Sequence, residues 1–155
     1  MSPNVIGLTT LPKLLPVTGG FALPFTAYYI LLSLRVVKER IREKRYLGDG
    51  SSGGPDRQSY HNDKLFLATR AHGNFLENVP LLFIVASLIE LNGGSRKALG
   101  WMLGGVLTSR VLHADLGLLM RGFGYGRPVG YYANLGLLGA MAGYGAYLVK
   151  GYWGF

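Results

Sequence analysis

Cysteine is absent from this chain of 155 residues. Its absence excludes disulfide bonds, thiolate metal sites and a protein thiol nucleophile, so any thiol chemistry would need a thiol supplied by a substrate. Histidine is scarce, with three residues in all. No second histidine shares a helix face with His72 at the spacing of two metal ligands, and we therefore expect no metal site.

Charged residues are also few, at 15% of the chain against 49% hydrophobic residues. The apolar residues gather into four continuous blocks, each near the roughly 20 residues that a membrane-spanning helix needs. The blocks do not alternate apolar with polar residues, which argues against a β-barrel. We therefore predict an all-α fold, an integral membrane four-helix bundle that forms a single domain over residues 1–155. The expected spans cover residues about 14–37, 65–91, 98–120 and 128–149.

The connections between the blocks predict an up-down bundle. Asn92–Ser95 and Gly122–Gly126 indicate two tight reversals, and such short links favour antiparallel neighbours. Residues 46–63 contain the run Gly48–Pro55, which indicates a flexible loop. Glycines four residues apart in the third and fourth blocks allow close helix approach, either within one chain or between subunits.

Basic residues outnumber acidic residues by 16 to 8, and their distribution favours a membrane over a nucleic acid. The links after the first and third blocks carry ten basic residues, whereas the opposite side carries four. By the positive-inside rule, loops one and three lie in the cytoplasm and both termini lie on the opposite side. The chain lacks the interleaved aromatic residues and the reading element of a nucleic-acid binder. We therefore expect a multi-pass protein of the endoplasmic reticulum or the bacterial inner membrane, with the lipid bilayer as a partner and no nucleic acid.

Ionisable side chains occur inside the second and third blocks, where they are costly unless a partner or a water-filled cavity receives them. Arg70, Asn74 and Glu77 share one helix face, and Arg110 and His113 share another. Both faces lie in the cytoplasmic half of their spans, so we expect them to meet. One interpretation is a structural network in which Glu77 pairs with Arg110 or Arg70 and Asn74 satisfies a backbone group. The other is a ligand site. Asp115 and His72 point away from these faces, Asp115 towards the third loop.

The start of the fourth block adds a third polar face, on which Arg127, Tyr131 and Asn134 follow one another at helical spacing. Tyr131 suits an interfacial aromatic belt and Arg127 suits a headgroup anchor. Together with Lys38 and Arg40, however, Arg127 predicts a positively charged cavity that would suit an anionic ligand with carboxylates and a thiolate.

The stretch Arg70–Pro80 resembles the signature of the MAPEG family, the membrane-associated proteins in eicosanoid and glutathione metabolism. The stretch reads Arg-Ala-His-Gly-Asn-Phe-Leu-Glu-Asn-Val-Pro. The run Arg110–His113, the four blocks and the basic first loop agree with this resemblance, which covers residues from about Phe21 to Val149. The chain is most similar to the short, uncharacterised bacterial branch of the family. The resemblance implies a homotrimer that binds glutathione between adjacent subunits near the cytoplasmic face.

The resemblance also implies roles for individual residues. Arg127 matches the arginine that lowers the pKa of the glutathione thiol, and it is the predicted catalytic residue. The residues that match glutathione-binding positions are Lys38, Arg70, Asn74, Glu77, Arg110, His113 and Tyr131. Glutathione is the expected cosubstrate, a hydrophobic molecule is the expected second substrate, and no metal is expected.

Three positions depart from the pattern of the prostaglandin-synthase members. Gly117 stands in place of a tyrosine, Pro128 in place of a serine that assists the thiolate, and Gly73 in place of a basic contact. These departures argue against prostaglandin isomerase and leukotriene synthase activity. They leave a microsomal glutathione transferase or peroxidase as the first hypothesis. A catalytically inactive trimer with a structural or partner-binding role is the alternative, and a small transporter ranks last because inverted repeats are missing.

Overall fold

Four long helices make up the computed structural model, which describes residues 14–48, 63–119 and 126–154. The helices are α1 (Pro16–Glu43), α2 (Lys64–Leu91), α3 (Arg96–Val111) and α4 (Gly126–Val149). A π-helical segment, η1 (Leu112–Leu119), continues α3, and a short 3-10 helix, η2 (Lys150–Trp153), follows α4. No strand occurs within the described ranges. The predicted all-helical architecture with four helices is therefore confirmed.

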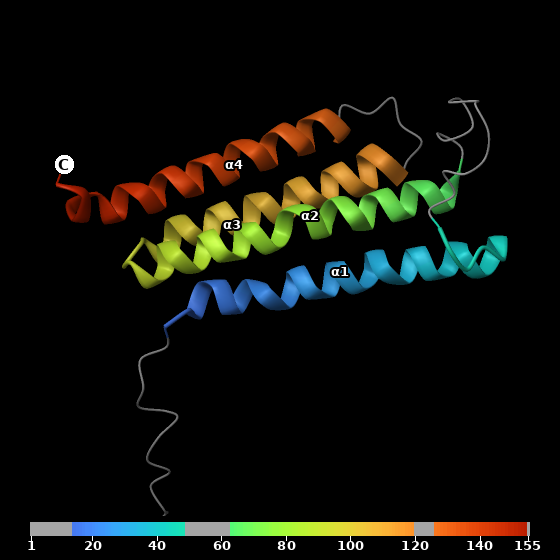
Figure 1. The fold of residues 1–155 in the computed structure, drawn as a ribbon, viewed down its shortest axis with the longest axis horizontal. Helices are drawn as coiled ribbons and strands as arrows, with labels where there is room; N and C mark the ends of the chain where they lie inside the picture. Colours follow the sequence, from blue (N-terminus) through green and yellow to red (C-terminus); the bar gives the residue numbers. More distant parts are fainter. Residues whose placement is uncertain (1–13, 49–62, 120–125, 155) are drawn as a thin grey trace, which may run out of the picture.

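The helices lie side by side, and consecutive helices run in opposite directions (Figure 1). The turn at Gly93, with a positive φ of 77°, joins α2 to α3 as the sequence predicts. The predicted reversal at Gly122–Gly126 and most of the predicted loop over residues 46–63 fall outside the described residues. α1 has 28 residues and is therefore about 42 Å long, which exceeds the roughly 30 Å of a bilayer core. Its last turn carries Arg40 and Arg42, and Lys44 follows as the C-cap residue.

The start of α1 is capped by α2 rather than by its own sequence. Leu15, which precedes the helix, offers no side-chain acceptor. The carboxylate of Glu90 instead accepts hydrogen bonds from the backbone N–H groups of Val17 and Thr18, both at 2.8 Å. Glu90 is 8% exposed, so this contact also fixes the end of α2 against the start of α1. A carboxylate suits this position because a helix start presents free N–H groups and a partial positive charge.

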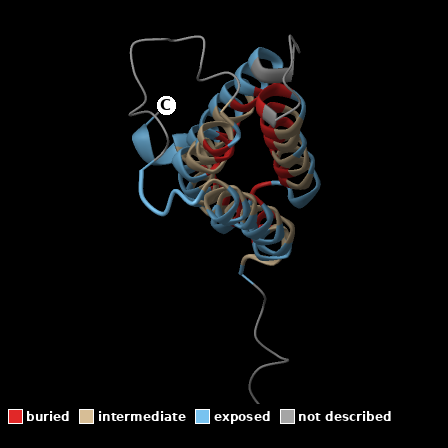
Figure 2. Cartoon of the chain, turned by 90° about the vertical axis from the view of Figure 1, so that its right-hand side faces the viewer, coloured by how far each residue is buried: buried red, intermediate tan, exposed pale blue. Residues whose placement is uncertain are grey.

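Apolar side chains form both the core and much of the surface. Figure 2 shows the buried residues on the inner sides of the four helices. The core includes Phe25, Leu32, Leu82, Leu103 and Met141, each at most 2% exposed. Large apolar side chains are exposed as well, among them Leu23, Ile30, Ile84, Leu88 and Trp101. By length and composition, α1 and α2 are each apolar enough to cross a membrane.

Candidate functional site

A buried arginine is at the centre of a polar network inside the bundle. Arg110, near the end of α3, is 2% exposed. It donates from Nη1 to the side-chain oxygen of Asn74 on α2 at 2.7 Å, and from Nη2 to the carbonyl oxygen of Gly130 on α4 at 3.4 Å. One guanidinium therefore connects three helices. Both acceptors are neutral, and among the described residues Arg110 forms no ion pair with Glu77.

Two further asparagines extend the network along α2 and α4. Asn78 donates from its amide to the carbonyl oxygen of Asn74 at 2.8 Å, and Asn134 donates to the side-chain oxygen of Asn78 at 3.2 Å. Asn134 is 1% exposed. The sequence placed Asn134 on a polar face of the fourth block with Arg127 and Tyr131, but it gave no role to Asn78. The signal for Asn78 is its position four residues after Asn74, which places both on one helix face.

Gly130 permits the close contact of α3 and α4 on which the network depends. A Cβ atom at this position would lie 2.6 Å from the carbonyl oxygen of Ser109 and 2.7 Å from the Cβ of His113. Both distances are shorter than real Cβ contacts, so any other residue would push the helices apart. The glycine also leaves its own carbonyl oxygen within reach of Arg110.

His113 and Tyr131 lie together beside the network. His113 is 6% exposed, and its ring centre lies 6.5 Å from that of Tyr131 on α4. Tyr131 is 41% exposed, so this pair reaches from the interior to the surface. Two buried atoms of the network, Nε of Arg110 and Oδ1 of Asn134, have no hydrogen-bond partner within the described structure. Buried polar atoms normally have partners, so these two leave capacity for a ligand or water.

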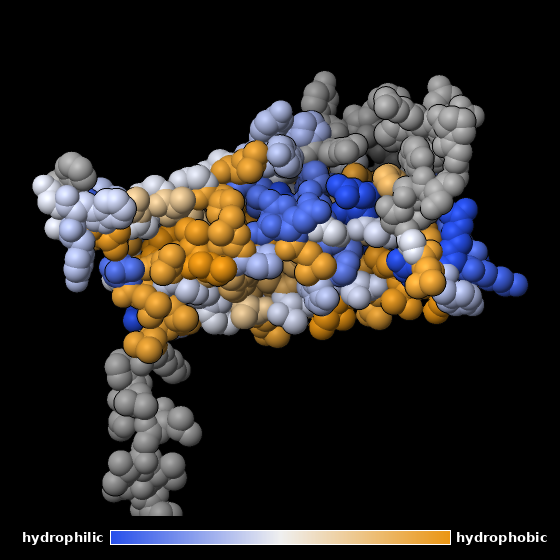
Figure 3. Space-filling model, viewed as in Figure 1, coloured by the Kyte–Doolittle hydropathy of each residue, from blue (hydrophilic) through white to orange (hydrophobic). Residues whose placement is uncertain are grey.

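Three of the predicted site residues lie on the surface of the single chain and do not join this network. Lys38 on α1 and Arg70 and Glu77 on α2 are exposed. Figure 3 shows a hydrophilic patch on the face of the bundle in view, next to a broad apolar surface. Arg127 is the second residue of α4, and its side chain lies outside the described part of the structure. The structure therefore brings together Asn74 with Arg110, and His113 with Tyr131, among the eight predicted residues.

A second polar cluster connects η1 to α1, and sequence reasoning did not find it. Asp115 accepts a hydrogen bond from the hydroxyl of Tyr28 at 2.9 Å and forms an ion pair with Arg35. From the sequence we expected Asp115 to lie towards the third loop, and we counted Arg35 among the basic residues of the first loop. In the structure, the side chain of Asp115 instead faces α1. Asp115 belongs to the π-helical segment Leu112–Leu119, where the helix no longer follows the 3.6-residue repeat.

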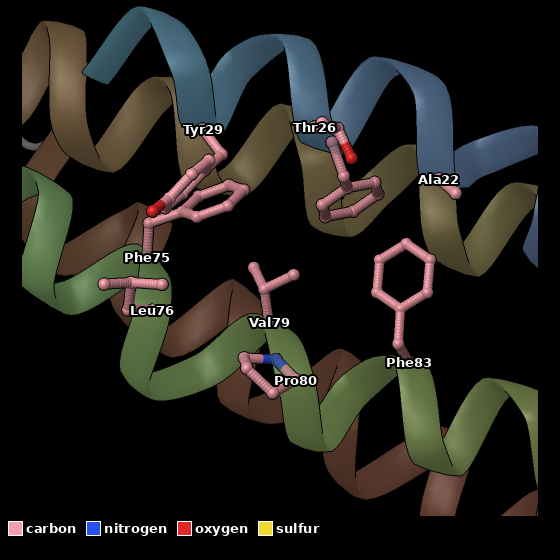
Figure 4. A pocket seen from close by; sticks show the side chains of 9 residues that line it. Ala22, Thr26, Tyr29, Phe75, Leu76, Val79, Pro80 and Phe83 are labelled. Carbon is pink, nitrogen blue, oxygen red and sulfur yellow. The ribbon is translucent and has the colours of Figure 1, made fainter. Parts of the chain in front are cut away.

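An apolar groove runs between α1 and α2 on the outside of the bundle (Figure 4). Phe75 and Tyr29 lie at one end of the view and Phe83 and Ala22 at the other. The groove has a volume of about 320 Å³, and its wall also includes Pro80. The groove lies on the two helices that are long and apolar enough to cross a membrane.

The described residues do not gather three or more histidine, aspartate or glutamate side chains at one point, which a protein-bound metal would require.

A sequence model of the MAPEG family matches residues 18–147, which is most of the chain. No curated protein and no solved structure matches the chain significantly. The matched range includes α2, α3 and η1 entirely, and with them every residue of the buried network.

Proposed function

The chain belongs to the MAPEG family and is an integral membrane protein, and on this basis we propose that it binds glutathione and activates its thiol. The thiolate would attack a hydrophobic electrophile or a lipid hydroperoxide that reaches the protein through the bilayer. This activity resembles that of the microsomal glutathione transferases. The observation that carries the proposal is the buried guanidinium of Arg110, held by Asn74 and Gly130 with its Nε unpaired.

The polar network supplies the groups that a tripeptide with two carboxylates and an ammonium group needs. Arg110 and Asn74 would orient the peptide backbone, and His113 and Tyr131 would line its path to the surface. A buried arginine costs free energy unless it is paired, so intramembrane arginines are commonly found at functional sites. Arg35, which is partly exposed on α1, would bind a carboxylate in addition to the predicted Lys38.

The exposed polar residues of α2 support a homotrimer in which adjacent subunits complete the site. Arg70 and Glu77 would be costly in contact with lipid, and a neighbouring copy would remove them from it. The glycine face of α4 is also open, because a Cβ at Gly139 or Gly143 would meet nothing within 4 Å. Small residues on an open helix face allow another helix to approach closely in a membrane.

Arg127 would stabilise the thiolate, since a nearby cation favours the charged form of a thiol. The thiol proton would leave to water.

In the transferase reaction, sulfur forms a bond to the electrophilic carbon as the leaving group departs. In the peroxidase reaction, sulfur attacks the terminal peroxide oxygen and an alcohol leaves. The resulting sulfenic acid then reacts with a second glutathione to give the disulfide and water. The apolar groove between α1 and α2 offers one place for the second substrate to approach.

Calorimetric titration of the full chain in detergent tests the binding proposal. Glutathione should bind saturably, and Arg110→Met should abolish the binding heat. No heat from the wild-type protein at millimolar glutathione would contradict the proposal.

The orientation with loops one and three in the cytoplasm is a separate proposal, which reagents that label introduced cysteines from one side of the membrane would test.

A catalytically inactive trimer is the second candidate. It is favoured by one observation, that Arg110, Asn74, Asn78 and Asn134 satisfy much of their hydrogen bonding among themselves. Pro128, which follows Arg127 where a serine would assist the thiolate, agrees with this reading. An inactive protein would bind no glutathione, or would bind it without forming a thiolate.

A further inference from the structure

A second apolar groove lies on the outside of the bundle, between the starts of α1 and α3. It has a volume of about 380 Å³, within the roughly 300–1,000 Å³ of small-molecule sites. Its walls are formed by side chains from residues 16–24 of α1 and by Arg96 and Gly100 of α3. Arg96 is the first residue of α3, and every other residue that lines the groove is uncharged. One cation therefore lies at the mouth of an apolar groove.

Glycines keep this groove open. A Cβ atom at Gly20 on α1 or at Gly100 on α3 would meet no heavy atom within 4 Å, so no neighbouring side chain fills the space beside them. The ring of Phe21 reaches across to α3, where it ends 3.9 Å from the position of a Cβ on Gly104. Gly104 lies one helical turn beyond Gly100, so the ring bounds the groove at its inner end. Gly20 is exposed, and the groove therefore opens to the surface of the bundle.

Positive charge predominates around the mouth of the groove. α1 and α3 begin at this end of the bundle, and α2 and α4 end there (Figure 1). The described residues at this end carry three cations, Arg96, Lys97 and Lys150, and one carboxylate, that of Glu90. The starts of two helices add further partial positive charge. An anion is therefore the ligand that this end of the bundle favours.

The guanidinium of Arg96 is available to such an anion. Arg96 is exposed, and it forms no ion pair with another described residue. Glu90 lies near enough for the two charges to interact. However, both oxygens of Glu90 accept backbone N–H groups of α1, and the residue is only 8% exposed. Glu90 therefore caps α1 and leaves the outer side of Arg96 open.

The combination of a guanidinium and an apolar wall selects a phospholipid of net negative charge. A guanidinium presents a fork of N–H donors that matches the oxygens of a phosphate. The wall beside it belongs to the first turns of a helix that is long and apolar enough to cross a membrane, and it suits an acyl chain. A free phosphate would leave this wall uncovered. The ammonium of a zwitterionic lipid would find no available carboxylate among the described residues at this end.

We propose that the groove between α1 and α3 binds one anionic phospholipid, with its phosphate on Arg96 and an acyl chain against Val17 and Phe21. The site is distinct from the polar network, because Arg96 and Arg110 lie about 21 Å apart along the axis of α3. It is also independent of glutathione binding. The bound lipid would connect the starts of α1 and α3, so anionic lipid should raise the thermal unfolding midpoint of the protein.

Native mass spectrometry of the full-length protein, released from detergent, measures bound lipid directly. The wild-type protein should retain one phosphatidylglycerol per chain in preference to phosphatidylcholine with the same acyl chains. Arg96→Gln should weaken phosphatidylglycerol binding about 10- to 100-fold, the effect of losing one hydrogen bond to a charged group, and should remove the preference. Lys97→Gln is the matched control, because it removes an adjacent exposed cation that does not line the groove. It should leave the binding of both lipids unchanged.

A second matched pair tests the apolar wall. Gly20→Leu fills the groove, so it should weaken the binding of both lipids. Gly19→Leu adds the same side chain at an equally open position of α1 that does not line the groove, and it should retain both lipids. Gly100→Leu fills the groove from α3, and it keeps the test decisive if Gly20→Leu does not fold.

Four outcomes would overturn the inference. Equal losses in Arg96→Gln and Lys97→Gln would indicate a diffuse attraction to the membrane surface, and equal retention of the two lipids by the wild-type protein would remove the selectivity. Displacement of the lipid by an equal concentration of inorganic phosphate would show that the acyl chain contributes nothing. A second copy of the chain in the groove would appear as a lipid-free oligomer that Gly20→Leu dissociates.

Discussion

The guanidinium of Arg110 and the side-chain oxygen of Asn74 lie 2.7 Å apart, in a bond that joins α3 to α2 across 36 positions of sequence. Both residues belong to polar faces within apolar helices, and each face would be costly in lipid without the other. The bond therefore accounts for two features together. It removes an intramembrane charge from the apolar surroundings, and it fixes the relative rotation of the two helices around the candidate site.

Removal of the Asn74 side chain should destabilise the protein strongly. Asn74→Ala leaves the buried Arg110 without its charge-assisted partner, which should cost about 1.5–3 kcal/mol of unfolding free energy. The matched control is Asn92→Ala, because Asn92 makes a bond of 2.8 Å to Leu88 but is exposed at the end of α2. Thermal unfolding in detergent, followed by circular dichroism, compares the two variants. Equal shifts in the unfolding midpoint would show that the bond between Arg110 and Asn74 stabilises the protein no more than the exposed bond of Asn92 does.

A larger side chain should destabilise the protein more at position 130 than at any open glycine position of the same helix. Gly130→Ala places a Cβ at 2.6 Å from the Ser109 carbonyl oxygen, so α4 must move away. Overpacking of this kind costs about 1–3 kcal/mol. Gly136→Ala is the control, because a Cβ there meets nothing within 4 Å. The control should be neutral or slightly stabilising, since alanine favours helices over glycine by up to about 1 kcal/mol. Chemical denaturation measures both, and a neutral Gly130→Ala would contradict the close approach.

The cap supplied by Glu90 should hold α1 in place. Glu90→Ala leaves the N–H groups of Val17 and Thr18 without their acceptor, and the loss of a helix cap costs about 0.5–2 kcal/mol. Hydrogen exchange by mass spectrometry should show faster exchange at the first turns of α1 and little change at α4. Glu43→Ala is the control, since its ion pair with Arg42 lies at the surface, where such pairs contribute about 0–1 kcal/mol. Unchanged exchange at Val17 in Glu90→Ala would rule out the capping role.

Much of the fold was predictable because hydropathy and helical phase act locally. The four apolar blocks correspond to the four helices, and helical phase together with chain direction predicted that the faces of Asn74 and Arg110 meet. Two features depend instead on tertiary geometry. The π-helical segment changes the phase after Leu112, so the facing of Asp115 towards α1 could not follow from a regular helix. The cap at Glu90 comes from a residue 73 positions away.

The partner of Arg110 could not be chosen from the sequence, which left open a structural network with Glu77 or a ligand site. The close approach of α4 at Gly130 instead presents a backbone carbonyl oxygen to Arg110, and Asn74 supplies a second neutral acceptor. Close helix packing decides between these acceptors, and a single sequence does not specify it. Glu77 is left on the exposed side of α2.

We propose above all that this membrane protein binds glutathione and converts its thiol to the thiolate, with Arg127 as the stabilising cation. The most direct measurement is the ultraviolet absorbance of thiolate when glutathione is added to the full-length protein in detergent at neutral pH. The wild-type protein should give a saturable thiolate signal, and Arg127→Ala should lose this signal while it retains glutathione binding by calorimetry. Bound glutathione that stays a thiol in the wild-type protein, or a thiolate signal that Arg127→Ala leaves unchanged, would contradict it.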